Sequence, residues 1–240
     1  MEREHPELCQ WGDMPLETVA ILARQIPKGV FIQLHWNGEP LLYYDFPAAL
    51  AEFSGHMIGL DTNGKLLIKH KKAICKYLTS ITISVIPDDP EGMDQLDIAG
   101  EFLEIGDRPL TIFRLLGEID DDREYLIKAL CEKRPKAEIC YRVLHRPEGS
   151  FGYEKPVVKP EIGICLEMLH KLAIDRYGNV YPCVRYDPRR LNLLGNIKNQ
   201  TLLNIWNGDK RQQWLQYHVD GRRDKVPLCA SCEFWGIPRG

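Results

Sequence analysis

The sequence lacks the features that would carry a chain into or across a membrane. No apolar run approaches the roughly 20 residues that are needed to span a bilayer. The chain starts MEREHP, which is charged and lacks the apolar stretch of a signal peptide. We therefore expect a cytoplasmic protein whose thiols stay reduced and which has no membrane partner.

The sequence also lacks an excess of charge of either sign. Lysine and arginine together number 31, aspartate and glutamate number 34, and the formal net charge is −3. This balance gives no indication of binding to nucleic acid or to a charged membrane surface. The hydrophobic content of 44% over 240 residues is ordinary for a globular protein with one large domain, or with one medium and one small domain.

Residues 1–145 alternate between two patterns. Five short β-rich runs predict strands at Val30–His35, Met57–Asp61, Ile81–Ile86, Leu110–Leu115 and Glu138–Leu144. Helical patterns lie before and between them, near Pro15–Gln25, Phe46–Ser54, Lys65–Leu78, Glu91–Glu104 and Asp120–Arg134. The last of these starts with three aspartates, whose carboxylates suit the N-terminus of a helix. The alternation predicts an α/β fold with a parallel sheet and right-handed crossovers.

A linker is predicted between residues 146 and 160, where proline and glycine are frequent. It divides the chain into expected domains at 1–150 and 151–240. In the second domain, Leu172–Asp175 and Val180–Cys183 flank a turn sequence and predict a hairpin, and Thr201 is a candidate N-cap for a helix through Trp206. So short and irregular a segment has a thin core and usually needs a metal or disulfide staple.

The eight cysteines are more than a plain globular domain needs, and their placement separates them into groups. Cys75, Cys131 and Cys140 sit among apolar neighbours, so we interpret each as a small buried hydrophobic residue.

Four cysteines in the second domain have spacing that suits a metal centre. Cys229 and Cys232 form a C-x-x-C pair, which lets two thiolates turn toward one metal. The predicted hairpin brings Cys183 back toward Cys165. Three interpretations stay open on this evidence: an iron–sulfur cluster, a structural zinc ion, and four unrelated buried cysteines. Zinc sites more often show two C-x-x-C pairs, and this region has one.

Residues 161–235 resemble the SPASM domain of radical S-adenosylmethionine (radical SAM) enzymes. The segments that carry the resemblance are Cys165-x12-Gly178-x4-Cys183, Leu194–Ile197, Asn204–Asn207 and Cys229-x2-Cys232. The resemblance implies an auxiliary 4Fe-4S cluster. The family's fuller pattern continues with further cysteines, enough for a second cluster, but none follows Cys232 here. It therefore implies one cluster, held by these four cysteines in a structural or electron-relay role.

The first domain resembles the radical SAM partial (β/α)6 barrel, a TIM-like fold, from its second strand onward. Ile32–Pro40 looks like the family's Gly-Gly-Glu segment, with Asn37 in place of the first glycine. By resemblance, the residues that contact S-adenosylmethionine would be Gly38, Glu39, Pro40, Asn63 and Ser84, with Arg114 also at a position where the family often contacts it.

The family's CxxxCxxC motif, which holds the radical-generating cluster, does not occur, and Cys9 is the only cysteine before Cys75. We therefore expect no reductive cleavage of S-adenosylmethionine by this chain as it stands, assign no catalytic residue, and expect S-adenosylmethionine as a cofactor only if the missing segment is supplied. We favour a truncated radical SAM enzyme, lacking the first barrel strand, over a degenerate relative.

Three functions follow as hypotheses. The first is a radical SAM/SPASM enzyme of the type that modifies peptides or proteins. The second is a non-catalytic iron–sulfur protein for electron relay or scaffolding. The third is a zinc-stabilised binding module. The candidate partners are a peptide or protein substrate and an electron-donor protein, with no nucleic acid and no membrane.

Overall fold

The computed structural model describes residues 12–36, 38–142, 163–185, 187 and 189–232. It divides into two compact units, one from residues 27–142 and the other from residues 12–26 together with residues 163–232. The boundary expected at residue 150 lies outside the described residues. Within these ranges, no helix combines the length and the apolar character that crossing a membrane requires.

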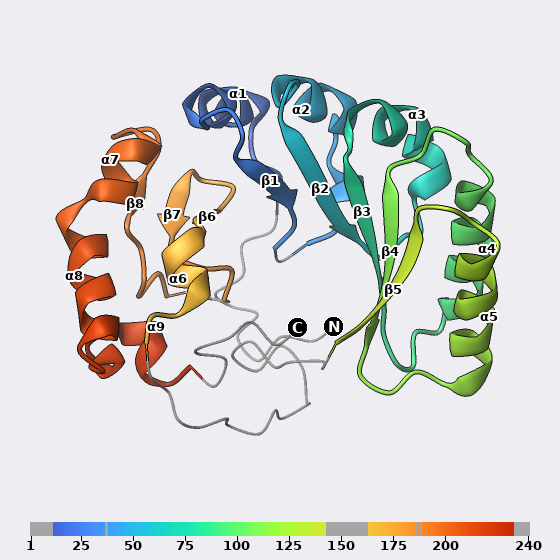
Figure 1. The fold of residues 1–240 in the computed structure, drawn as a ribbon. Helices are drawn as coiled ribbons and strands as arrows, with labels where there is room; N and C mark the ends of the chain where they lie inside the picture. The colour runs from blue at the N-terminus through green and yellow to red at the C-terminus, as the bar shows by residue number, and fades with distance from the viewer. Residues whose placement is uncertain (1–11, 37, 143–162, 186, 188, 233–240) are drawn as a thin grey trace. The chain divides into compact units, whose positions relative to one another are not determined.

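The first unit is built on a parallel sheet whose strand order follows the chain, β1-β2-β3-β4-β5 (Figure 1). The strands are β1 (Phe31–Leu34), β2 (Met57–Thr62), β3 (Ser80–Val85), β4 (Leu110–Leu116) and β5 (Ala137–Arg142). The helices are η2 (Pro40–Leu42), α2 (Phe46–Glu52), α3 (Leu67–Tyr77), α4 (Gly92–Leu103) and α5 (Asp121–Glu132). The five strands and their intervening helices confirm the sequence prediction of a parallel α/β unit.

The two faces of this sheet differ in character because successive side chains point to opposite sides. Ile58 and Leu60 of β2, Ile83 of β3 and Phe113 of β4 are at most 1% exposed and form the core. Helices α2, α3, α4 and α5 contact one another in series, and α4 and α5 run along one face of the sheet in Figure 1. The alternate positions, among them Gln33, Asp61, Ser84 and Arg114, carry the polar side chains of the other face.

The second unit has short elements around a small antiparallel sheet. Its elements are α1 (Leu16–Gln25), α6 (Leu166–His170), β6 (Ala173–Ile174), β7 (Asn179–Tyr181), β8 (Gly195–Asn196), α7 (Leu202–Asn207), α8 (Asp209–Val219), η3 (Arg223–Lys225) and α9 (Pro227–Ala230). The predicted hairpin is β6–β7. Gly178 closes it at φ +84°, where a Cβ would meet Ile197 at 2.9 Å. Thr201 caps α7 as predicted, accepting a hydrogen bond from the Asn204 N–H at 3.2 Å.

Helix α1 belongs to the second unit, although the sequence pattern placed it with the first domain. Gln25, at its last turn, donates to the Ile197 carbonyl at 3.3 Å and accepts from the Leu202 N–H at 2.8 Å. These partners are more than 170 residues away along the chain, so no local pattern could have identified them.

Candidate iron–sulfur site

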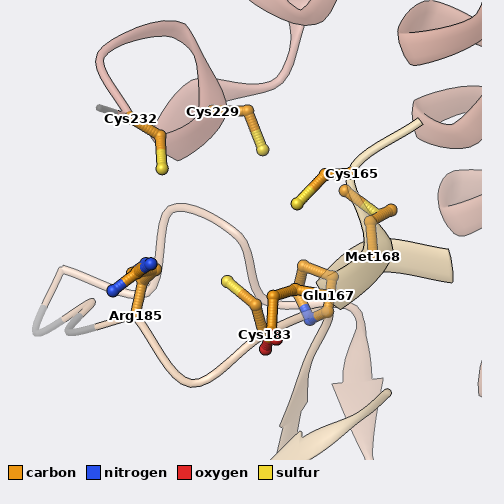
Figure 2. Close-up of a pocket in the computed structure, with 8 residues that line it drawn as sticks. Cys165, Glu167, Met168, Cys183, Arg185, Cys229 and Cys232 are labelled. Carbon is orange, nitrogen blue, oxygen red and sulfur yellow. The ribbon is translucent and has the colours of Figure 1, made fainter. Parts of the chain in front are cut away.

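Four cysteines line one cavity of the second unit: Cys165, Cys183, Cys229 and Cys232. Figure 2 shows their sulfur atoms pointing toward the same space. Glu167, Met168, Pro182 and Arg185 complete the lining. The structure therefore brings together all four cysteines that the sequence selected as metal ligands.

Cys165 stands at the N-cap of α6 with extended backbone angles. Its N–H donates to His218 Nδ1 at 3.3 Å, and His218 is fully buried. Burial lowers the pKa of His218, and the charge of Arg223 lowers it further. A neutral ring whose Nδ1 accepts this bond fixes the backbone that carries Cys165.

Cys183 follows strand β7 and comes directly after Pro182, which restricts the backbone entering the site. The Arg185 backbone N–H forms a hydrogen bond with the Cys183 sulfur. Burial nevertheless raises the pKa of the Cys183 thiol to about 12, so the thiol is protonated at neutral pH unless a metal replaces the proton.

Cys229 and Cys232 are held by the short helix α9 and the turn after it, in which the Cys232 N–H donates to the Cys229 carbonyl at 3.3 Å. The Arg223 guanidinium donates to both carbonyls, with 3.2 Å to that of Cys232. Burial is the main cause that raises the pKa of the Cys229 thiol, and a hydrogen bond from Asn192 opposes it. One arginine thus fixes the backbone of the whole C-x-x-C segment.

A small apolar cluster supports the site from behind. Met168, Trp214 and Val226 are 5% exposed or less, and Cys165 and Cys229 pack against them. Arg211 is 2% exposed and donates to the carbonyls of Met168 at 2.8 Å, Leu169 at 3.1 Å and Trp206 at 3.2 Å. The ends of α6 and α7 are therefore joined to α8 through this buried guanidinium.

The donor set fits an iron–sulfur cluster. Four cysteine sulfurs face one cavity, and thiolates are the ligands that such clusters take. Among the described residues, no group of three or more His, Cys, Asp or Glu is already gathered around the position of a single metal ion.

Four of the residues expected to contact S-adenosylmethionine, Gly38, Glu39, Pro40 and Asn63, follow the ends of β1 and β2, and Ser84 lies in β3. One Glu39 carboxylate oxygen accepts from the Leu41 N–H at 3.0 Å and the Thr62 hydroxyl at 2.7 Å, and the other from the Asn63 N–H at 2.7 Å. An ionised carboxylate has about four acceptor sites, so a further donor can still be accommodated. Pro40 opens the 3-10 helix η2, and a Cβ at Gly38 would meet no protein atom within 4 Å.

Gln95 joins this group to the end of β3. It is fully buried, and its amide donates to the carbonyls of Asn63 at 2.6 Å and Ser84 at 3.0 Å. Arg114 lies on the polar face and forms an ion pair with Asp61 at 2.6 Å.

Sequence reasoning missed the supporting residues of both groups: His218, Asn192, Arg223, Arg211 and Gln95. Each acts through a partner distant along the chain or through backbone atoms, so spacing carried no signal for them.

The interpretation of Cys75, Cys131 and Cys140 as buried was wrong in degree, because all three are partly exposed.

The family model for SPASM, an iron–sulfur cluster-binding domain, matches residues 165–233. The S-adenosyl-L-methionine-dependent 2-deoxy-scyllo-inosamine dehydrogenase of Niallia circulans is 31% identical over 68 residues, which is 28% of this chain and 27% of that protein. The match therefore spans about a quarter of the relative's length.

Two solved structures share the fold over nearly the whole chain. BtrN in complex with AdoMet and 2-DOIA covers 97% of this chain and 83% of its own, with a TM-score of 0.54 and 20% identity. SuiB of Streptococcus suis, bound to S-adenosylmethionine, covers 95% of this chain and 67% of its own, with a TM-score of 0.66 and 15% identity. At these identities the similarity shows the fold alone.

Proposed function

We propose that this chain, a radical SAM/SPASM protein by its SPASM segment and its fold, holds one 4Fe-4S cluster on Cys165, Cys183, Cys229 and Cys232. The observation that carries the proposal is the convergence of these four thiols on one cavity, within the segment that matches the iron–sulfur family. The polar atoms around the sulfurs, including the Arg185 N–H and the Asn192 amide, add hydrogen bonds of the kind that tune such clusters.

The cluster would supply one-electron chemistry and a structural staple. Four protein thiolates leave no iron open for a substrate, so we assign the site to electron relay or structural support. The chain's own contribution is to hold the thiols in place through Arg223, His218 and the apolar cluster behind them. The chain also keeps water from this part of the cavity wall, because Met168, which lines the cavity, is only 2% exposed.

We further propose that the first unit is the greater part of a partial (β/α)6 barrel that binds S-adenosylmethionine at the strand ends near Gly38, Glu39, Pro40, Asn63 and Ser84. The hydrogen bond from the Asn63 N–H to the Glu39 carboxylate supports this, because it joins two of the expected residues at the carboxyl ends of β1 and β2. Without a CxxxCxxC segment we expect no cleavage of S-adenosylmethionine by these 240 residues alone.

The partners that we propose are a peptide or protein substrate and an electron-donor protein, in the cytoplasm. The named relative from Niallia circulans is a dehydrogenase of an inosamine, so a small-molecule substrate is the alternative.

The first experiment is metal analysis of the full chain purified without oxygen. We expect roughly four irons and roughly four sulfides per chain with a broad visible absorbance. Cys229→Ala should lose most of both, because one of the four ligands is gone. Cys131→Ala is the matched control: it removes a partly buried thiol away from the cavity and should leave the iron content unchanged.

Two results would contradict the proposal. A colourless protein with about one zinc per chain would replace the cluster with structural zinc. Equal iron in Cys229→Ala and wild type would show that the iron is held elsewhere.

A further inference from the structure

Asn192 brings a polar side chain to one of the proposed ligands. Its amide nitrogen Nδ2 lies 3.9 Å from the Cys229 sulfur, within reach of an N–H···S hydrogen bond. The residue is 1% exposed, so water does not compete for this donor. An amide placed so deeply and aimed at a sulfur calls for a functional explanation as well as a structural one.

The orientation of the amide is fixed by a second contact. The Leu228 backbone N–H donates to Asn192 Oδ1 at 3.0 Å. A backbone N–H can only donate, so the oxygen of the amide has to face Leu228 and the NH2 group has to face Cys229. In a flipped amide, the NH2 group would face the Leu228 N–H, which is also a donor, and the amide oxygen would face the Cys229 sulfur.

The backbone that carries Asn192 is fixed as well. The buried Asp187 carboxylate accepts from the Asn192 N–H at 2.8 Å and from the Leu191 N–H at 2.9 Å. The donor is therefore pre-positioned by its own backbone and by its amide oxygen before any cluster binds.

We propose that Asn192 is a positioning and tuning residue, whose amide donates to the Cys229 thiolate and raises the reduction potential of the cluster. This inference rests on the proposed function. A donor to a ligating sulfur withdraws negative charge from the cluster, and the reduced state carries one more electron than the oxidised state. The hydrogen bond therefore stabilises the reduced state more.

Asn192→Asp separates this role from structural support. An aspartate keeps an acceptor for the Leu228 N–H and puts a carboxyl oxygen in the place of the NH2 donor. Asn196→Asp is the matched control. Asn196 is an amide of the same unit that donates to Asn179 Oδ1 at 2.9 Å and accepts from the Lys198 N–H at 2.8 Å, and it does not line the cavity.

The measurement is a dithionite titration of the full chain, reconstituted without oxygen and followed by electron paramagnetic resonance, with iron and sulfide determined on the same samples. We expect a more negative potential in Asn192→Asp, a smaller shift of the same sign in the uncharged Asn192→Ser, and little change in Asn196→Asp. Equal potentials in the loaded wild type, Asn192→Asp and Asn192→Ser would overturn the tuning role.

The remaining outcomes are also decisive. Loss of the cluster from both Asn192 variants, with Asn196→Asp loaded, would replace tuning by a role in holding the cluster. A wild-type chain without iron and sulfide would overturn the proposed function, and this inference with it.

Discussion

Single buried polar residues decide much of the behaviour of this protein. Arg211, His218 and Asn192 are at most 2% exposed. Arg211 donates to the Met168 carbonyl, His218 accepts from the Cys165 N–H, and Asn192 donates to the Cys229 sulfur. In the first unit, the partly buried His70 packs its ring edge-on against Phe46, with 5.2 Å between ring centroids.

The stability of the first unit should depend on pH through His70. Burial lowers the pKa of His70, and the charge of Lys69 lowers it further, while a hydrogen bond with the Leu41 backbone offsets part of the effect. The unfolded chain therefore takes up the proton at a higher pH than the folded chain, near its usual pKa of about 6.5. The contribution of neutral His70 to the free energy of unfolding is complete above that pH and is lost as the pH falls through the pKa of His70 in the folded chain.

We expect the slope of unfolding free energy against pH, measured by urea titration between about pH 7 and pH 5, to be shallower in His70→Gln than in wild type. Parallel slopes in the two proteins would show that His70 does not cause the acid dependence.

At the scale of elements, helix α1 shows how a segment can belong to a unit that is distant in sequence. It ends at Gln25, whose side chain bonds to the Ile197 carbonyl and the Leu202 N–H. The second of these bonds satisfies a backbone N–H at the start of α7, where a helix has no internal acceptor. Helix α1 therefore supports the cysteine-rich unit.

Gln25→Ala should lower the unfolding free energy of the cysteine-rich unit by about 1–2 kcal/mol, because a backbone donor and acceptor lose their partner. Amide exchange at Ile197 and Leu202 reports the change locally. Arg24→Ala is the control at the neighbouring exposed position and should have little effect. If the two variants exchange alike, the side-chain bonds of Gln25 do not hold α1 to this unit.

The whole molecule combines units whose stability has different sources. The parallel sheet unit has a core of large apolar side chains, such as Phe102 and Phe113, that are fully buried. The cysteine-rich unit relies on a small apolar cluster and on the ligands around one cavity. A unit of that kind gains much of its folding free energy from the group that it binds.

Removal of the metal with an iron chelator should therefore loosen one unit selectively. We expect faster amide exchange in residues 163–232 and unchanged exchange in the strands between residues 57 and 116. Cys229→Ala, treated in the same way, should show little further change. Equal loosening of both units would mean that the metal stabilises the sheet as well.

The sequence by itself determined the parallel sheet, its helices, the β6–β7 hairpin and the four-cysteine set. These depend on local periodicity, on turn residues and on ligand spacing, all of which lie within a few residues or within a recognisable motif. Asp120, for example, was identifiable as a helix N-cap and does accept from the Arg123 N–H at 2.9 Å. Strand β8 and helix α8 are too short or too polar to have shown a pattern.

Only the tertiary structure decided which distant groups support the site. The pairs Gln25 and Leu202, Cys165 and His218, and Asn192 and Cys229 are separated by 177, 53 and 37 residues. The physical reason is that hydrogen bonds and burial act across space. The Asn192 amide meets the Cys229 sulfur, and the His218 imidazole meets the Cys165 backbone N–H, only after the chain has folded around them.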